Sequence, residues 1–571
     1  MMWYLQNVAR FKSEQDGLRE LEREAPWLRI AGWRMDSSLR LCMDAEIVLH
    51  RTFTITLRYG LSFPSTAPSV LPQTPERWSE HQYGNDELCL EYGPDNWIPE
   101  LTGADMIRSA HRLLSGEAPR GTDLVLPVPS RHTTTLGQDL RNIFARFLTT
   151  HTLTSMLASA TPGRTGKARF FTLYREKTYM VVPVEISGLS DEGWRDTEVP
   201  EAVSYFASTH EGLAFTLPQE ITLPRLETGS ELKHYLSEHG FAQPADYEPG
   251  SWELLLVSTG TGPRLLWIWR DGSVHDIPVI PSNVGKRLDS DHIALNGKTV
   301  GLVGCGSAGS KIATMLARAG VRSFVLIDDD LFLPENLVRH ELDWASIGEH
   351  KAEGLARRLA LVAPGVKSIV RCQQLGGQES NGATDWSLKI LRDCDLIIDA
   401  TANPKVFNLI SGVVHEGKKP FVWMEVFAGG IGGLIGRSRP NLDPAPQYIR
   451  AQVDAWCQQK GVAAPRSAHS YAVEADNSPL IATDADVGVI AAHAARFSID
   501  ILIGRTPSLF PVSVYLVGLA PAWIFEQPFQ TFPIDVGRAR ATAEPAPADP
   551  ADVQQILQMM VDNHDQPAST S

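Results

Sequence analysis

The chain has 571 residues, and its 52 Lys and Arg residues against 67 Asp and Glu residues give a formal net charge of −15. This length predicts three or four domains. General nucleic-acid binding needs clustered Lys and Arg, so the acidic balance argues against a nucleic-acid partner. The first residues lack the apolar core of a secretory signal, and the most apolar stretch, 511–525, is too short to span a membrane. Six scattered cysteines without metal-type spacing favour the reducing cytoplasm.

The first predicted unit, residues 1–118, has an α+β pattern. A helical stretch at 11–25 comes first, and a helix with Met106, Ala110 and Leu113 on one side closes the unit. A stretch rich in proline, 64–75, predicts no regular structure. Between the first helix and this stretch lie three strand-like runs at 28–35, 38–49 and 51–59.

Residues 119–285 carry no recognisable chemistry and are predicted to form a mixed connecting domain of unknown fold. Helical patterns occur at 136–148 and 231–239. Strand-like runs occur at 168–175, 178–186, 252–258 and 264–270.

Residues 286–525 alternate between strand and helix patterns, which predicts a mostly parallel sheet covered by helices. The last stretch, 526–571, is rich in Ala, Pro, Asp and Ser, and we expect a mobile tail with a short helix at 551–561. The predicted fold class is therefore multidomain, with α+β and α/β parts.

A glycine-rich turn marks the candidate nucleotide site. The predicted strand at 299–303 runs into Gly304, Gly306 and Gly309, spaced as G-x-G-x-x-G, and then into a helix. Such glycines let the backbone approach phosphate, and the helix N-terminus offers free N–H groups. The next strand ends at Asp328, where an acid often holds a ribose hydroxyl. Up to this point an NAD-dependent oxidoreductase fits equally well.

The residues that follow separate these alternatives. Asp328, Asp330, Asn336, Arg339 and Lys351 fall within D-x-D-x5-N-L-x-R-H and G-x-x-K-A. This resembles the signature of the ThiF/MoeB and ubiquitin-activating adenylyltransferases. The resemblance implies a Rossmann-like adenylation domain over 286–525, with ATP held by the three glycines and these five residues. Arg339 and Lys351 would be catalytic, since cations can neutralise the triphosphate as pyrophosphate leaves.

The predicted strand 395–403 resembles the family's D-x-T-D-N segment, with Ala402 in place of the second Asp, which helps to hold magnesium. The resemblance leaves Asp399, three residues earlier, as the expected Mg²⁺ and nucleotide ligand, with help from Asp330.

Cys89 and its neighbours form the second candidate site in the sequence. It lies in the run His81–Leu90, which precedes the sequence W-I-P-E-L-T at 97–102. This resembles the ubiquitin-conjugating fold, whose catalytic cysteine follows HPN and precedes W-[ST]-P-x-L-T. The resemblance implies a UBC-like domain over 1–118 with a thioester on Cys89. The Pro and Asn beside His81 are missing, and Asn85 is a candidate replacement. The alternative is that Cys89 is a small buried hydrophobe.

A ubiquitin-activating enzyme usually has a thiol of its own. Cys305, Cys372 and Cys394 fall in turn or strand positions and are predicted to be structural, which leaves Cys457 as the candidate carrier. In bacterial relatives this thiol precedes the last helix, where the present chain has no cysteine at 474–479. The competing hypothesis is direct transfer from the adenylate to Cys89.

Together the domains resemble the fused conjugating–activating enzymes of bacterial CBASS anti-phage operons. The resemblance implies a homodimer that activates a partner's C-terminal glycine as acyl-adenylate and joins it to an amine on a target. The partner would be a cGAS-like nucleotidyltransferase or a ubiquitin-like protein. Two alternatives stay open: a sulfur-carrier adenylyltransferase of the ThiF/MoeB type, and a non-catalytic nucleotide-binding scaffold.

Overall fold

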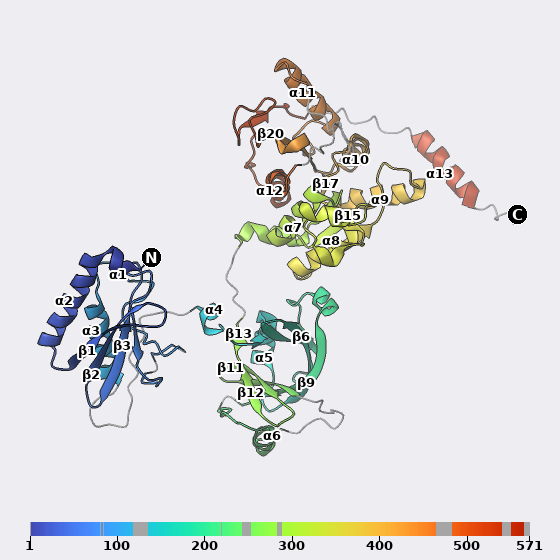
Figure 1. The fold of residues 1–571 in the computed structure, drawn as a ribbon. Coiled ribbons are helices and arrows are strands. Elements are labelled where there is room, and N and C mark those ends of the chain that lie inside the picture. The colour runs from blue at the N-terminus through green and yellow to red at the C-terminus, as the bar shows by residue number, and fades with distance from the viewer. Residues whose placement is uncertain are drawn as a thin grey trace. The chain divides into compact units, whose positions relative to one another are not determined.

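The computed structural model describes residues 2–79, 81–83, 85–117, 135–218, 220–241, 253–281, 288–463, 482–539 and 550–564. The chain divides into two compact units, Met1–Arg141 and Asn142–Ser571, which are described separately (Figure 1). Within the described ranges, no helix combines the length and apolar character that crossing a bilayer would require.

The first unit is an antiparallel sheet packed against helices. Its strands pair in the order β1-β2-β3-β4, and their bounds are Leu28–Met35, Leu41–Val48, Thr52–Arg58 and Ser69–Pro72. The helices are α1 (Trp3–Gln6), α2 (Val8–Glu24) and α3 (Gly103–Glu117). The prediction of no regular structure at 64–75 was wrong, because that stretch contains β4. An edge strand tolerates proline, since one side of it donates no ladder hydrogen bonds.

A buried carboxylate holds this unit together. Glu14 on α2 accepts hydrogen bonds from Tyr59 Oη (2.8 Å) and from Gly103 N at the start of α3 (2.7 Å). Burial raises the pKa of Glu14, and Arg10 pairs with it at 2.9 Å. Arg10 also donates to the carbonyls of Pro99 and Leu101. The W-I-P-E-L-T segment is therefore fixed against α2.

The middle of the chain forms a larger sheet with the order β12-β11-β10-β9-β6-β7-β5-β13, and β8 pairs with β7. The strands are β5 (Ala145–Leu148), β6 (Thr165–Arg175), β7 (Thr178–Ser187), β8 (Trp194–Arg195), β9 (Ser208–Thr216), β10 (Glu253–Thr259), β11 (Gly262–Ile268), β12 (Val274–Ile277) and β13 (Val279–Ile280). The helices with this sheet are α5 (His151–Ser159), α6 (Gly229–Glu238) and the 3-10 turn η1 (Glu201–Tyr205). The short helix α4 (Leu136–Asp139) still belongs to the first unit.

All four predicted strands in this region are confirmed, and so is the helix at 231–239. The predicted helix at 136–148 was wrong, because only Leu136–Asp139 is helical. Phe147 instead lies in β5, fully buried between β7 and β13. Tertiary pairing overrides the local helical pattern there.

The last part of the chain contains an eight-stranded sheet in the order β16-β15-β14-β17-β18-β19-β20-β21. Its first five strands are parallel, and the last three are antiparallel to their neighbours. The strands are β14 (Thr299–Val303), β15 (Ser323–Ile327), β16 (Lys367–Arg371), β17 (Leu396–Asp399), β18 (Phe421–Val426), β19 (Gly432–Ser438), β20 (Val514–Gly518) and β21 (Thr531–Ile534).

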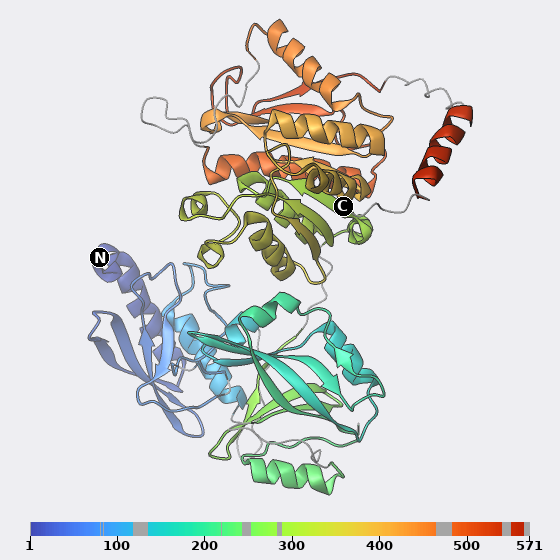
Figure 2. The ribbon, with the colours of Figure 1, turned by 90° about the vertical axis from the view of Figure 1, so that its right-hand side faces the viewer.

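Helices cover both faces of this sheet (Figure 2). They are α7 (Ser307–Ala319), α8 (Lys351–Val362), α9 (Asn381–Asp393), α10 (Pro404–Gly417), α11 (Pro446–Gln459) and α12 (Asp484–Ile503); 3-10 turns are η2 (Ser290–Gly297), η3 (Pro334–Val338), η4 (Trp344–Ser346) and η5 (Ala428–Gly430). The mostly parallel sheet is thus confirmed.

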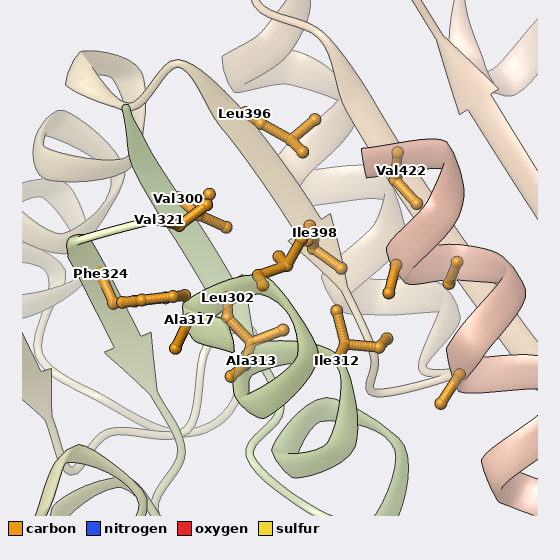
Figure 3. Packing of buried hydrophobic residues seen from close by; sticks show 14 of the residues in the cluster. Val300, Leu302, Ile312, Ala313, Ala317, Val321, Phe324, Leu396, Ile398 and Val422 are labelled. Carbon is orange, nitrogen blue, oxygen red and sulfur yellow. The ribbon is translucent and has the colours of Figure 1, made fainter. Parts of the chain in front are cut away.

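Alternate residues of the central strands enter two separate cores. Leu302 and Ile398 point toward α7 and α12 (Figure 3), whereas Val303 and Ile397 belong to the cluster with α10 and α11. This period of two on a sheet buried on both faces explains the continuous apolar runs of the sequence.

The predicted tail boundary at 525 was wrong. β21 adds a strand to the sheet edge, and Ile534 and Val536 are buried in the core. The expected short helix is confirmed as α13 (Pro550–His564). The boundary was misplaced because β21 is short and depends on pairing with β20, which local composition does not report.

A buried ion pair ties β19 to α12. Arg437 is fully buried and donates to Asp500 Oδ2 at 3.1 Å, to Ser508 Oγ and to the carbonyl of Phe510. Asp500→Ala would leave this guanidinium without its counter-charge, and we expect a loss of about 3–5 kcal/mol in the free energy of unfolding of this domain. Denaturant unfolding measures it. The exposed pair Arg392–Glu416 supplies the control, because Glu416→Ala should cost less than about 1 kcal/mol. Equal effects of the two variants would contradict the argument.

Candidate functional site

The glycine-rich turn lies between β14 and α7, as predicted. Gly304 has a φ of +88°, which favours glycine. A Cβ on Gly309 would lie 1.9 Å from the carbonyl oxygen of Gly304, so only glycine allows the helix to approach the strand this closely. The turn leads directly into α7, whose first N–H groups form an N-terminus suited to an anion.

Asp328 supports this turn from the end of β15. Its carboxylate accepts from Cys305 N at 2.6 Å and from Asp330 N at 2.9 Å. Burial raises the pKa of Asp328, and these two N–H donors oppose the rise. Asp328 therefore fixes both the turn and the acidic loop, in addition to facing the space predicted for a ribose.

The predicted cations converge on the same space. Arg339 Nε donates to Ser307 Oγ at 3.1 Å, and Lys351 Nζ lies 2.7 Å from Asp330 Oδ2. Asn336 Oδ1 accepts from Leu333 N and thereby shapes η3. Together with Gly304, Gly306, Asp328 and Asp330, these three side chains line one cavity of about 450 Å³. Gly309 packs against Gly304, which is one of the lining residues.

His340 was part of the predicted motif but not among the predicted site residues. Its Nε2–H donates to the carbonyl of Cys305 at 2.7 Å, and its Nδ1 accepts from Leu342 N at 3.1 Å. These bonds fit one neutral tautomer. Burial lowers the pKa of His340 to about 4, so the ring is neutral at pH 7 and holds the turn without adding charge.

Other lining residues were not predicted as site residues, although Thr401 and Asn403 belong to the segment that resembles D-x-T-D-N. They follow strand ends, where parallel strands deliver loops to the same sheet edge. Among them are Gln373, Gln374, Leu375, Thr401 and Asn403.

Asp399 is not among the residues that line the cavity. It ends β17 with 2% of its surface exposed, and its Oδ1 accepts from both the backbone N and the Oγ1 of Thr401. The hypothesis that Asp399 ligates magnesium is therefore not supported by its position. Ala402 itself faces the cavity with a φ of +54°, a conformation that Asp and Asn adopt more readily than Ala.

The acidic loop offers the alternative donors. One carboxylate oxygen each of Asp328, Asp329 and Asp330 lies within 4.8 Å of the others. Mg²⁺ prefers oxygen ligands and commonly uses one or two carboxylates plus substrate phosphates. These residues, beside the cavity that the cations line, fit a magnesium ion that arrives with a nucleotide.

Cys89 is half-buried rather than enclosed in the core. It lies on a short hairpin in which Gln82 and Leu88 form an antiparallel β-bridge. In the same hairpin, Cys89 N donates to the carbonyl of His81 at 2.8 Å. Its thiol donates to the hydroxyl oxygen of Tyr83 at 3.4 Å. The alternative of a small buried hydrophobe does not describe this position.

The other cysteines divide differently from the prediction. Cys457 is fully buried on α11, and burial raises the pKa of its thiol, so the expectation of an accessible carrier there was wrong. Cys305 and Cys394 are buried as predicted, whereas Cys372 is exposed at the end of β16 and is not a core residue. The segment 474–479 lies outside the described residues.

The buried Asp399 yields a test of stability against pH. Burial raises its pKa from 3.8 to about 6. Between these values the folded protein holds a proton that the unfolded chain has released, so stability falls as pH rises through about 4 to 6. Asp399→Asn removes this loss and should raise the free energy of unfolding at pH 7 by about 1–3 kcal/mol. The gain should shrink toward pH 4. Denaturant unfolding at several pH values measures this gain, and Asp393→Asn at an exposed position is the control. A gain that does not vary with pH would contradict the raised pKa of Asp399.

Comparison with known proteins agrees with this site. Residues 288–511 match the ThiF family, and residues 166–282 match a domain observed between E2 and E1 domains. The uncharacterized protein y4qC of Sinorhizobium fredii is 32% identical over 160 residues, which cover 27% of this chain and 26% of y4qC. The ATP-dependent ubiquitin transferase-like protein Cap2 of Pseudomonas aeruginosa is 30% identical over 161 residues, 25% of this chain and 26% of Cap2. Cap2 of Escherichia coli is 34% identical over 144 residues, 24% and 23% of the two chains.

The aligned parts thus span about a quarter of the length of these curated relatives. Among solved structures, E. coli MccB with ATP matches 44% of this chain and 68% of its own, with 15% identity and a TM-score of 0.34. The chain therefore carries a domain of the kind found between E2 and E1 domains, followed in the sequence by a ThiF-family, E1-like domain. It is a distant relative of the Cap2 ubiquitin transferase-like proteins.

Proposed function

We propose that the protein adenylates the C-terminal glycine of a partner protein with ATP, passes the acyl group to Cys89 and joins it to an amine on a target. The convergence of Arg339 and Lys351 on one cavity with the glycine-rich turn carries the proposal. A dehydrogenase transfers hydride and has no use for two cations at this place, whereas pyrophosphate release needs them.

In the first step the partner's carboxylate oxygen attacks the α-phosphorus of ATP, a new P–O bond forms, and the bond to pyrophosphate breaks. The N-terminus of α7 and the turn face the phosphates. Lys351 now pairs with Asp330 at 2.7 Å and can exchange that partner for phosphate oxygens. Mg²⁺ bound by the acidic loop would neutralise part of the triphosphate charge. Arg339, held by Ser307, supplies a fixed positive charge.

In the second step the thiolate of Cys89 attacks the acyl carbon, and AMP leaves. Direct transfer from the adenylate is favoured because Cys457 is buried and Cys89 is not. In the third step a target amine attacks the thioester, an amide forms, and the thiolate departs while the amine proton passes to solvent. Each step breaks one activated bond, which divides a difficult acyl transfer into easier ones.

The N-terminal unit supports this role as a UBC-like domain. It has the helices α1 and α2, a four-stranded antiparallel sheet and then α3, with Cys89 between β4 and α3 in the chain. From the resemblance to the fused conjugating–activating enzymes of CBASS operons, we further propose that the protein is a cytoplasmic homodimer that acts in anti-phage defence. The activated partner would then be a cGAS-like nucleotidyltransferase or a ubiquitin-like protein.

Covalent trapping tests the proposal. The protein is incubated with ATP, magnesium and a lysate of its own source, and is then run on a non-reducing gel. We expect an ATP-dependent adduct that thiol reagents remove from the wild type and that persists as an ester in Cys89→Ser.

Lys351→Ala should reduce pyrophosphate release by roughly 100-fold or more, because it removes a charge that acts on the leaving group.

Cys457→Ser is the matched control and should leave the adduct unchanged. Loss of the adduct in that variant would restore a two-cysteine relay. Pyrophosphate release without any adduct would favour a sulfur-carrier adenylyltransferase, and the absence of both would favour a non-catalytic scaffold.

A further inference from the structure

The hairpin that carries Cys89 has one buried side and one open side. Gln82 and Leu88, the bridged pair, are 8% and 3% exposed. Since successive residues of a strand point to opposite faces, the neighbours on either side of this pair face outward. Tyr83 and Cys89 thus share the open face as diagonal cross-strand neighbours, a spacing that long aromatic side chains can bridge.

Hydrogen bonds of the buried Gln82 side chain and of the backbone hold this geometry in place. The Gln82 amide Nε2 donates to the carbonyls of Glu76 (2.9 Å) and Asp86 (3.0 Å), and its Oε1 accepts from Trp78 N. Tyr83 N donates to the carbonyl of Glu87 at 2.8 Å. The backbone under both Tyr83 and Cys89 is therefore fixed, although the Tyr83 side chain is 52% exposed.

We propose that Tyr83 is a catalytic residue whose hydroxyl donates a hydrogen bond to the Cys89 thiolate, both before attack on the acyl-adenylate and when the thiolate leaves the thioester. This inference rests on the proposed function. In the thiol form Cys89 Sγ donates to Tyr83 Oη at 3.4 Å. Loss of the thiol proton to solvent reverses the direction of that bond, and hydrogen bonding to the charged form favours it.

The surrounding charges agree with a phenol that remains protonated. The hydrogen bond with Cys89, with smaller contributions from burial and from Glu87 and Asp95, raises the pKa of Tyr83 to about 12. Tyr83 therefore keeps its proton at neutral pH and can donate it. His81, which lies opposite Cys89 on the hairpin, is a further titratable group on the open face.

Asn85 is less suited to this role. Its side-chain oxygen accepts from Glu87 N at 3.4 Å and so turns toward its own loop. Tyr83, in contrast, already contacts the reacting sulfur.

Tyr83→Phe in the full-length protein tests the inference, with Tyr92→Phe as a matched control in the same unit. The rate of Cys89 alkylation by iodoacetamide is followed by mass spectrometry between about pH 6 and pH 10, without ATP. We expect Tyr83→Phe to slow alkylation at pH 7 by about three- to tenfold and to move the pH midpoint of alkylation upward. Loss of a hydrogen bond to a charged sulfur disfavours the thiolate, and the effect stays moderate because this hydrogen bond is partly exposed to solvent. Tyr92→Phe should match the wild type.

An unchanged profile in Tyr83→Phe would overturn the inference. A second measurement follows the ATP-dependent adduct on Cys89. Tyr83→Phe should slow its formation by a similar factor, while the first, single-turnover release of pyrophosphate, which precedes thiol attack, keeps the wild-type rate. If the wild type forms no adduct, the proposed function fails, and the alkylation profile still decides whether Tyr83 stabilises the thiolate.

Discussion

The close approach of α7 to β14 is the constraint on which the nucleotide site depends. Gly309 lies so near the carbonyl of Gly304 that no side chain fits between them. The turn is then held from three sides by Asp328, His340 and Arg339, which bond to Cys305 N, Cys305 O and Ser307 Oγ. These bonds bring the acidic loop and η3 to the turn. A segment distant in sequence thereby supplies cations where the phosphates of a nucleotide would lie.

The two reactive centres are built on different principles. The cavity gathers fixed charges around a rigid turn, which suits a step in which pyrophosphate leaves with several negative charges. Cys89 lies on a hairpin where its thiol is partly exposed and is hydrogen-bonded to Tyr83. In the proposed reaction, adenylation would therefore depend on the charges gathered at the sheet edge, and acyl transfer would depend on access to the Cys89 sulfur.

Buried polar pairs stabilise both parts. Glu14 joins α2, Tyr59 and α3 in the first unit, and Arg437 with Asp500 joins β19 and α12 in the adenylation domain. Each group is desolvated and hydrogen-bonded, so removing one partner leaves a buried polar or charged group without compensation. These pairs fix how the helices that border each centre pack against their sheets.

Local motifs in the sequence, through their resemblance to known families, predicted the glycine-rich turn, Asn336, Arg339 and Lys351 as one site, and the structure places them around one cavity. The role of Cys89 stays a prediction of the sequence. Only the tertiary structure excluded Cys457 and placed Asp399 outside the cavity lining, since burial depends on what packs from elsewhere. It also revealed β4, β21 and the contact of Tyr83 with Cys89. Strand pairing and side-chain contact join residues through space, and no periodicity along the chain reports them.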